Sequence, residues 1–529
     1  MKTSHMVAAI FVVAAWLFLP AAPAFAREQR IVFNLGVEPK TLDPHQAQGE
    51  PEGHVILNVI EGLTRTDAQG HPVPAIAERW ETSDDGLMYR FFLREARWSH
   101  GAPVTADDFV FGWRRCLAPE TAGPYAYQLF FVAGAEDYNS GKVSDPAAVA
   151  VRAVTSRTLE VRLRGPAPFF PAVLAHYAYS PLPEAHIKAH PDWARTPQQY
   201  PSNGPFRLTE WRHNDRLTLV RNPEYYAADR VRLETLVMTM ITNESTALLQ
   251  WEAGALDIVN SLPLPDIPRL MREGKYRSAP FLATYYVLFN HSARPFDDPR
   301  VRRAFSLAID RDQITSAILR GGQQPARALV PPGIEMAGGD FRATSGDLFR
   351  ENANEARRLL AEAGYPGGRR FPRVKYLYND REDHRLIAQA LQGMWLSTLG
   401  VRVDLDVQDW KVFLQNRKQG NYQFARAGWI GDYLDPVNFL DMYTSNAGNN
   451  DAFYKNPEFD RLIAEAGMTA DTTRRVNLLR EAEAMLIGRD MAVAPIYFYV
   501  REFAQKPYVK GVVRNPVGNI YFDGAFVEP

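Results

Sequence analysis

Strand-like and helix-like patterns alternate along this chain, and the alternation restricts its fold class. Residues 401–410 alternate charged with apolar side chains, as a half-buried strand does; the apolar ones are Val401, Val403, Leu405 and Val407. Before them, residues 384–399 show helical spacing and end at Gly400. We place the buried face of that helix on Leu386, Ala390, Leu391, Met394 and Leu399. The pattern predicts an α/β protein with mixed sheets.

Two further stretches carry helix start and stop signals. Residues 298–312 begin with Asp298 as the N-cap and Pro299 at the first helical position. The apolar face expected for this helix is formed by Val301, Ala304, Phe305, Ala308 and Ile309. The stretch 352–368, NANEARRLLAEAGYPGG, predicts a second capped helix that ends at Gly364 and Pro366.

The chain is long for a single domain, yet it has no obvious linker. Its 529 residues are 46% hydrophobic, which is enough to bury a large core and to build more than one domain. The 38 prolines are scattered rather than gathered in one tract. We therefore expect domains that are connected by strands crossing between them more than once.

The first 26 residues predict export. Lys2, an apolar run from Met6 to Leu19 and the ending Ala24-Phe25-Ala26 form a secretory signal peptide with cleavage after Ala26. An uncleaved membrane anchor is the alternative, but the run is shorter than the roughly 20 residues of a spanning helix. No cysteine follows the signal to carry a lipid. We expect a soluble, exported protein without a direct membrane anchor.

The single cysteine and the nearly neutral charge limit the kinds of cross-link, metal site and partner that the chain can have. Cys116 is the only cysteine, so neither an intramolecular disulfide nor a cysteine metal cluster can form, and we expect it to be a buried helix residue. The formal net charge is −1. A nearly neutral chain argues against nucleic acid or an anionic membrane surface as a partner.

The sequence contains none of the familiar catalytic signatures GxSxG, Walker loop, GxGxxG or HExxH. His186 and His190 have the i,i+4 spacing of metal ligands, but no other ligands are near them in sequence, so we interpret them as a solvated helix face. We expect no metal and no cofactor. Carboxylates beside tryptophans, as in WIGDYLDP at 429–436, leave a glycosidase-like hydrolase open as an alternative.

A series of longer stretches occurs in a characteristic order: TLDPH (41–45), EGLTRTDAQGHPVPAIAERWE (61–81), FFLREARWSHGAPVTADDFVFGWRR (91–115), SNGPFRLTEW (202–211), VRNPEYY (220–226), DPRVRRAFSLAIDRD (298–312), RRLLAEAGY (357–365) and WKVFLQNRKQGNYQFARAGWIGDYLDP (410–436). Together they resemble the oligopeptide-binding proteins of bacterial ABC peptide importers, which belong to family 5 of the extracytoplasmic solute-binding proteins. The resemblance covers nearly all of the chain after the signal.

This resemblance implies a two-lobed periplasmic-binding-protein-like type II fold with an extra inserted domain and a ligand cleft between the lobes. Carried onto this chain, lobe one would comprise 27–60, 184–282 and 500–529. The inserted domain would be 61–183, and lobe two would be 283–499.

The resemblance also implies that an extended peptide pairs its backbone with protein strands on both sides. Those strands would be Gly428–Ile430, with Trp429 in the middle, and Gln48–Glu50, with Gly49 in the middle. Asp432 would receive the α-ammonium group of the peptide in a charge-assisted pair. A loop-capping role is the alternative for Asp432.

At its other end the peptide needs a cation for its carboxylate. The resemblance assigns that charge, according to ligand length, to Arg426, Arg417 and His384, with ion pairs at the surface as the alternative for the arginines. The aromatic residues that would line side-chain pockets are Tyr125, Tyr286, Trp410 and Trp429, for which a place in the core is the alternative.

Two positions depart from the family pattern. Leu319 stands where close relatives have a lysine for the carboxylate of longer peptides, with Arg320 and Arg327 nearby. Gln48 stands where they have a glutamate, although a backbone role survives that change. Both departures bear on the preferred peptide length rather than on the class of ligand.

The sequence thus predicts a receptor that captures short peptides, roughly di- to pentapeptides, in the periplasm of a Gram-negative bacterium. Its expected partner is the permease of an inner-membrane ABC transporter, and the receptor itself is expected to be a monomer. The alternatives are a receptor for murein peptide or another solute of the family, and a periplasmic hydrolase. The presence of both Arg426 and Asp432 favours a ligand with an amine and a carboxylate over a nickel complex.

Overall fold

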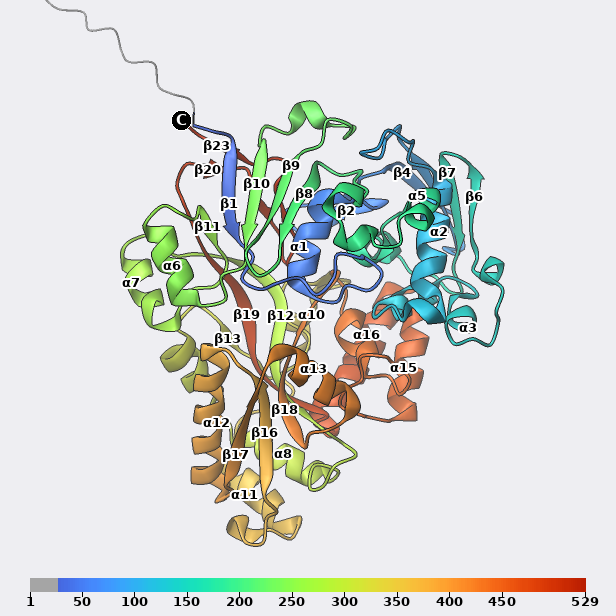
Figure 1. Ribbon diagram of the computed structural model, residues 1–529. Helices are drawn as coiled ribbons and strands as arrows, with labels where there is room; N and C mark the ends of the chain where they lie inside the picture. The colour runs from blue at the N-terminus through green and yellow to red at the C-terminus, as the bar shows by residue number, and fades with distance from the viewer. Residues whose placement is uncertain (1–26) are drawn as a thin grey trace, which may run out of the picture.

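The computed structural model describes residues 27–529, so the expected signal peptide lies outside the described residues. One sheet of 11 strands runs through the molecule (Figure 1). Its order is β17 (Val403–Gln408), β16 (Val374–Asn379), β18 (Phe424–Ile430), β12 (Arg277–Phe289), β19 (Val493–Gln505), β11 (Ile258–Val259), β1 (Arg30–Asn34), β10 (Thr235–Thr239), β9 (Arg216–Arg221) and β8 (Phe206–Arg212), with β13 (Gln324–Pro325) paired to β19.

Two long strands connect the upper and lower parts of the molecule in Figure 1. β12 and β19 have 13 residues each and pair in an antiparallel manner along most of their length. Their register is interrupted between Pro280 and Thr284. β11, β1, β10, β9 and β8 lie on one side of this interruption, and β16, β17 and β18 lie on the other. The two parts are therefore joined by strands rather than by a linker.

A second, smaller sheet lies at the right of Figure 1. Its four strands are antiparallel and run in the order β4 (Ala77–Thr82), β5 (Met88–Leu93), β7 (Thr158–Arg162) and β6 (Val151–Thr155). Helix α2 (Ala106–Leu117) packs against this sheet. Cys116 is fully buried in α2, as predicted, and burial raises the pKa of its thiol to about 12.

The other longer helices complete the two parts of the molecule. They are α1 (Glu50–Val59), α6 (Glu244–Glu252), α8 (Pro299–Leu307), α11 (Ala353–Glu362), α12 (Glu382–Leu399), α13 (Trp410–Gln419), α15 (Pro457–Gly467) and α16 (Thr472–Glu483). In the part of the chain from residue 27 onward, no helix combines the length and the apolar character that crossing a membrane requires.

The helix signals at α8 and α11 are confirmed. The Asp298 carboxylate accepts a hydrogen bond from the backbone N–H of Arg300 at 2.8 Å, and all five residues of the predicted apolar face of α8 are buried. In α11 the N-cap is Asn352. The helix stops before Gly364, whose φ of +98° is strained for residues that have a β-carbon and is readily adopted by glycine.

The buried face of α12 differs from the prediction. The helix ends at Gly400 as expected. Its buried apolar side chains are Ile387, Ala388, Leu391, Trp395 and Leu399, whereas Leu386, Ala390 and Met394 lie on the flank. The physical reason is Trp395, whose large ring packs against Phe305 and Phe424 and thereby sets the rotation of the helix.

The strand predicted at 401–410 is present as β17. Val403 is buried, but Val407 is 51% exposed. β17 is the last strand at one end of the sheet, so a side chain there lacks a neighbour on one side. The strand prediction is confirmed, and of the apolar side chains named for it Val401 and Val403 are the buried ones.

Candidate ligand-binding site

Strand β18 presents an unpaired edge. On one side it pairs with β12 along its whole length, from Phe424 opposite Phe289 to Ile430 opposite Ala283. On the other side, β16 pairs only with Phe424 and Ala425. Residues 426–430, which include Gly428, Trp429 and Ile430, therefore have no strand partner on that side among residues 27–529. Such an edge can accept an extended chain through main-chain hydrogen bonds.

The strand predicted at Gln48–Glu50 does not include Glu50. Gly49 is extended (φ −98°, ψ 161°), but Glu50 is the first residue of helix α1. Pro51 in the first turn explains the difference, because proline favours the start of a helix. The carbonyls of Gln48 and Gly49 accept hydrogen bonds from the hydroxyls of Tyr125 and Tyr177, both at 3.4 Å.

Glu50 does not face a ligand as a free charge, because its carboxylate forms an ion pair with Arg501 and lies 3.6 Å from His54. Burial raises the pKa of Glu50, but the charges of Arg501 and His54 outweigh it and leave the pKa below its usual value. Glu50 therefore contributes a structural ion pair at the start of α1.

Asp432 follows β18 and is held by side chains from distant parts of the chain. Its Oδ2 accepts hydrogen bonds from Gln128 Nε2 at 2.6 Å and from Asn438 Nδ2 at 3.3 Å. Its backbone N–H donates to Asn438 Oδ1 at 2.9 Å. Its Oδ1 lies 3.6 Å from Nε2 of His176, and the side chain is only 9% exposed. These contacts orient the carboxylate but bring it no cation.

The electrostatics of Asp432 are those of an unpaired buried acid. Burial raises its pKa to about 6. Burial also lowers the pKa of His176 to about 3, so this histidine is neutral near pH 7 and its contact with Asp432 is no ion pair. In residues 27–529, no lysine or arginine nitrogen lies within 4.0 Å of the Asp432 carboxylate. A ligand ammonium would supply the missing positive charge.

Arg426 is the complementary case, a cation with no anion. It lies on β18, where Nη2 donates to the Tyr499 hydroxyl at 3.1 Å and Nη1 reaches Asn379 Oδ1 at 3.5 Å. Its Nε is buried without a partner. The guanidinium sits over the Tyr285 ring at 5.2 Å, and no carboxylate in the described chain lies within ion-pair distance of it. A ligand carboxylate could bind here.

Of the other two candidate cations, Arg417 is already paired and His384 has a lowered pKa. Arg417 on α13 binds Asp451, with Nη2 2.7 Å from Oδ2. His384 on α12 is almost completely buried; burial and the charge of Arg426 hold its pKa well below the usual value. Its Nδ1 is buried without a hydrogen-bond partner in the described chain, and the expected role of His384 as a cation for the ligand stays a prediction.

The four candidate aromatic residues do not gather in one place. The Tyr125 ring lies 4.4 Å from that of His176, and Trp429 Nε1 donates to Asn438 Oδ1 at 3.1 Å, so both surround Asp432. Tyr286 is buried in β12, and Trp410 is 46% exposed at the start of α13, where it stacks on Phe413.

Sequence reasoning missed Gln128, His176 and Asn438. Gln128 is 304 positions from Asp432, so no local pattern connects them. Asn438 could have been predicted from the local sequence. It follows Asp435-Pro436 at the start of the short helix α14 (Val437–Leu440), where a side-chain amide is well placed to form hydrogen bonds with the preceding loop.

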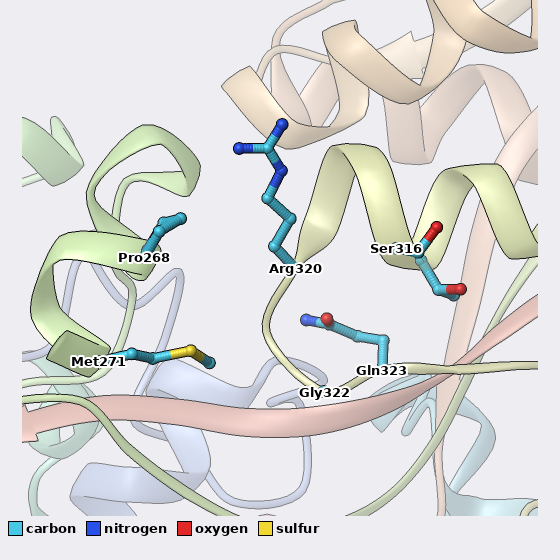
Figure 2. A pocket seen from close by; sticks show the side chains of 7 residues that line it. Pro268, Met271, Ser316, Arg320, Gly322 and Gln323 are labelled. Atoms are coloured by element: carbon cyan, nitrogen blue, oxygen red, sulfur yellow. The ribbon is translucent and has the colours of Figure 1, made fainter.

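An open groove of about 580 Å³ lies elsewhere, between Pro268 and Met271 on one side and a turn containing Arg320 on the other (Figure 2). None of the predicted ligand-binding residues lines it. Leu319 is buried, and Arg327 is paired with Asp312 at 2.8 Å and Glu351 at 2.9 Å.

The pair His186 and His190 is not part of the candidate ligand-binding site either. The rings of His186 and His190 are 4.5 Å apart, on and just after α5 (Glu184–Ala189). From residue 27 to the C-terminus, no group of three or more His, Cys, Asp or Glu side chains is arranged to hold a metal ion.

The chain is similar to known proteins over most of its length. Residues 71–451 match the model of the bacterial extracellular solute-binding proteins, family 5 Middle. The oligopeptide-binding protein OppA of Bacillus subtilis is 38% identical over 507 residues, covering 94% of this chain and 92% of that protein. OppA of Haemophilus influenzae, solved in complex with RPPGFSPFR, has a TM-score of 0.87 at 34% identity, covering 95% of this chain and 99% of that one.

The arrangement of the lobes can be compared as well. The murein tripeptide-binding protein MppA of Escherichia coli has a TM-score of 0.88 at 32% identity, covering 95% of this chain and 99% of that one. An unliganded open form of MppA has a TM-score of only 0.70 at 33% identity, covering 95% of this chain and 98% of that one. The lobes are thus arranged as in the peptide complex rather than as in the open form. The chain belongs to family 5 of the bacterial extracellular solute-binding proteins and has their two-lobed fold.

Proposed function

We propose that the protein is a receptor that binds short peptides between its two lobes and delivers them to an ABC importer. The observation that carries this proposal is that a buried carboxylate without a cation, Asp432, and a buried cation without an anion, Arg426, lie six positions apart on and just after β18. This separation is roughly 20 Å along a strand. A peptide of about five residues, extended along the free edge of β18 and charged at both ends, would satisfy both.

The division into lobes follows the same argument. Lobe one would comprise 27–60, 184–282 and 500–529, and lobe two would comprise 283–499. The interruption of the β12–β19 register between Pro280 and Thr284 supports a boundary there. The separate four-stranded sheet supports an inserted domain at 61–183. Asp432 of lobe two would then meet Gln128 and His176 of the inserted domain when the lobes close.

Location and partners extend the proposal. The protein would be exported by the signal peptide of residues 1–26 into the periplasm of a Gram-negative bacterium, act there as a monomer, and dock on the permease subunits of an inner-membrane transporter. The names of relatives as oligopeptide-binding and periplasmic murein-tripeptide-binding proteins support this. They are binding proteins, which disfavours a hydrolase.

Native mass spectrometry of the purified protein tests the proposal directly. We expect bound di- to pentapeptides, and after their removal we expect tripeptides to bind with one-to-one stoichiometry and to be recovered uncleaved. Peptide cleavage, or the absence of peptide binding after the removal of cargo, would contradict the proposal.

A receptor for murein peptide is the second candidate, because the TM-score to MppA equals that to the OppA complex within 0.01. Titration of a murein tripeptide against an all-L tripeptide separates the two candidates. A clear preference for the murein peptide would favour the second.

A further inference from the structure

A second unpaired carboxylate lies next to the Asp432 site. Asp441 comes three positions after Asn438, one helical turn beyond the side chain that holds Asp432. Its Oδ1 is sealed from solvent and has no hydrogen-bond partner in the described structure. None of the contacts that hold Asp432 or Arg426 involves this oxygen.

Tyr433 and Tyr127, two buried tyrosines that interact electrostatically with Asp441, each retain unused hydrogen-bonding capacity at the hydroxyl. Tyr433 is completely buried, yet its hydroxyl has no hydrogen-bond partner in residues 27–529. The Tyr127 hydroxyl accepts from Gln128 Nε2 and from Asn449 Nδ2, both at 3.3 Å, and donates to no acceptor in the described chain. Buried polar groups normally have partners, so this cluster is arranged for a polar group that comes from outside the chain.

The charges in this region do not balance. Asp435 is neutralised by Arg475, whose two Nη atoms lie 2.8 and 2.9 Å from its oxygens. No such partner exists in residues 27–529 for Asp432 or Asp441, and His176 is neutral. Burial, together with the charges of Asp432 and Asp435, raises the pKa of Asp441 to about 8. Near pH 7 Asp441 is therefore mostly protonated while no ligand is bound. The single α-ammonium group of a peptide pairs with Asp432, so Asp441 can ionise only if a second cation arrives.

We propose that Asp441 forms a second cation subsite that selects peptides whose first residue has a basic side chain. The inference rests on the proposed function. The α-ammonium group binds Asp432, and the flexible side chain of a first-position lysine or arginine carries its charge to Asp441. Several N–H donors on one cation then satisfy Asp441 Oδ1 and the Tyr433 hydroxyl oxygen together.

Titration of two matched tripeptides tests the subsite. One begins with lysine and the other with norleucine, which has the same chain length without the charge; both keep a free α-amine. We expect the wild-type protein, cleared of cargo, to bind the lysine peptide roughly tenfold or more tightly at pH 7. In Asp441→Asn the ratio should fall to about one, with the norleucine peptide bound as before.

Proton release gives a second readout that needs no variant. Asp441 must lose its proton to pair with a cation, so calorimetry in two buffers of different ionisation enthalpy should show more protons released with the lysine peptide than with the norleucine peptide. Equal affinities and equal proton release in the wild type would overturn the subsite while leaving the peptide receptor intact. Failure of both peptides to bind would overturn the receptor as well.

Discussion

Oδ1 of Asp432 lies 3.6 Å from Nε2 of His176, and yet the two residues do not form an ion pair. Burial lowers the pKa of His176 to about 3 and raises that of Asp432 to about 6, so near pH 7 a mostly ionised acid faces a neutral ring. The ring and the amides of Gln128 and Asn438 shape a socket for a cation without filling it.

The first prediction concerns the α-amine of the ligand. Acetylation of a peptide removes its ammonium group and leaves Asp432 unpaired in a buried site. Loss of a buried charged partner costs roughly 3–5 kcal/mol, on the order of a hundred- to a few thousand-fold in affinity. Calorimetric titration of the free and the acetylated peptide measures the ratio. The Asp432→Asn variant should bind the free peptide much more weakly than the wild type does. The difference in affinity between the free and the acetylated peptide should therefore be smaller in the variant. Equal binding of both peptides by the wild type would show that Asp432 is not the socket.

A second prediction is that the same residue destabilises the protein when no ligand is bound. The pKa of Asp432 is raised from 3.8 to about 6, so its contribution to the free energy of unfolding is present below pH 4 and is lost as pH rises through 6. About two pKa units correspond to roughly 3 kcal/mol. Asp432→Asn, cleared of cargo, should therefore unfold at a higher urea concentration than wild type at pH 7, and at nearly the same concentration at pH 4. A variant that is less stable at pH 7 would refute this.

A third prediction is the pH dependence of peptide binding. Only ionised Asp432 pairs with an ammonium group, so affinity for a free peptide should be lost as pH falls through about 6. Between pH 7 and pH 5 the loss should be about tenfold, because the ionised fraction falls by that factor. The acetylated peptide should not show this loss, and it serves as the control. Affinity that rises on acidification would contradict the assignment.

Local signals in the sequence predicted some elements well and others poorly. α8 and α11 were predictable because their caps, Asp298 and Asn352, act within a few residues. The rotation of α12 was not, because residues 384–399 contain more apolar side chains than one face can bury, and the choice depends on how Trp395 packs against Phe424 from another strand.

The site shows the same division between local and distant information. The resemblance pointed to Asp432 and Arg426, whose charges the fold leaves unpaired. It could not indicate that Arg417 would find Asp451, 34 positions away, or that Gln128 would hold Asp432. Contacts of this kind depend on how segments that are distant in the sequence pack against one another, which no short stretch encodes.

The fourth prediction separates the two arginines. A free peptide and its C-terminal amide should differ in affinity by roughly ten- to a hundredfold, the usual contribution of a charge-assisted hydrogen bond. Arg426→Met should remove this difference, because the Arg426 guanidinium lacks an anion in the described chain. Arg417→Met is the matched variant; it should keep the difference, since Arg417 is occupied by Asp451. If the difference were instead lost in Arg417→Met and kept in Arg426→Met, Arg417 rather than Arg426 would bind the peptide carboxylate.

The last prediction concerns closure. Gln128 holds the carboxylate of Asp432 across 304 positions of chain, and Asn449 reaches Tyr127 across 322. The present arrangement of the lobes therefore depends on contacts between distant segments, and we expect the pair β12 and β19 to act as the hinge. Without a ligand, closure buries an unpaired acid and an unpaired arginine, which costs free energy; a peptide removes both costs and shifts the population toward the closed form. Small-angle scattering of the cargo-free protein should therefore show a radius of gyration that falls when peptide is added. At the same peptide concentration the acetylated, amidated peptide should produce little change, because it satisfies neither charge. If saturating free peptide leaves the radius unchanged, the charge-driven hinge is wrong, and the lobes must already be closed without a ligand.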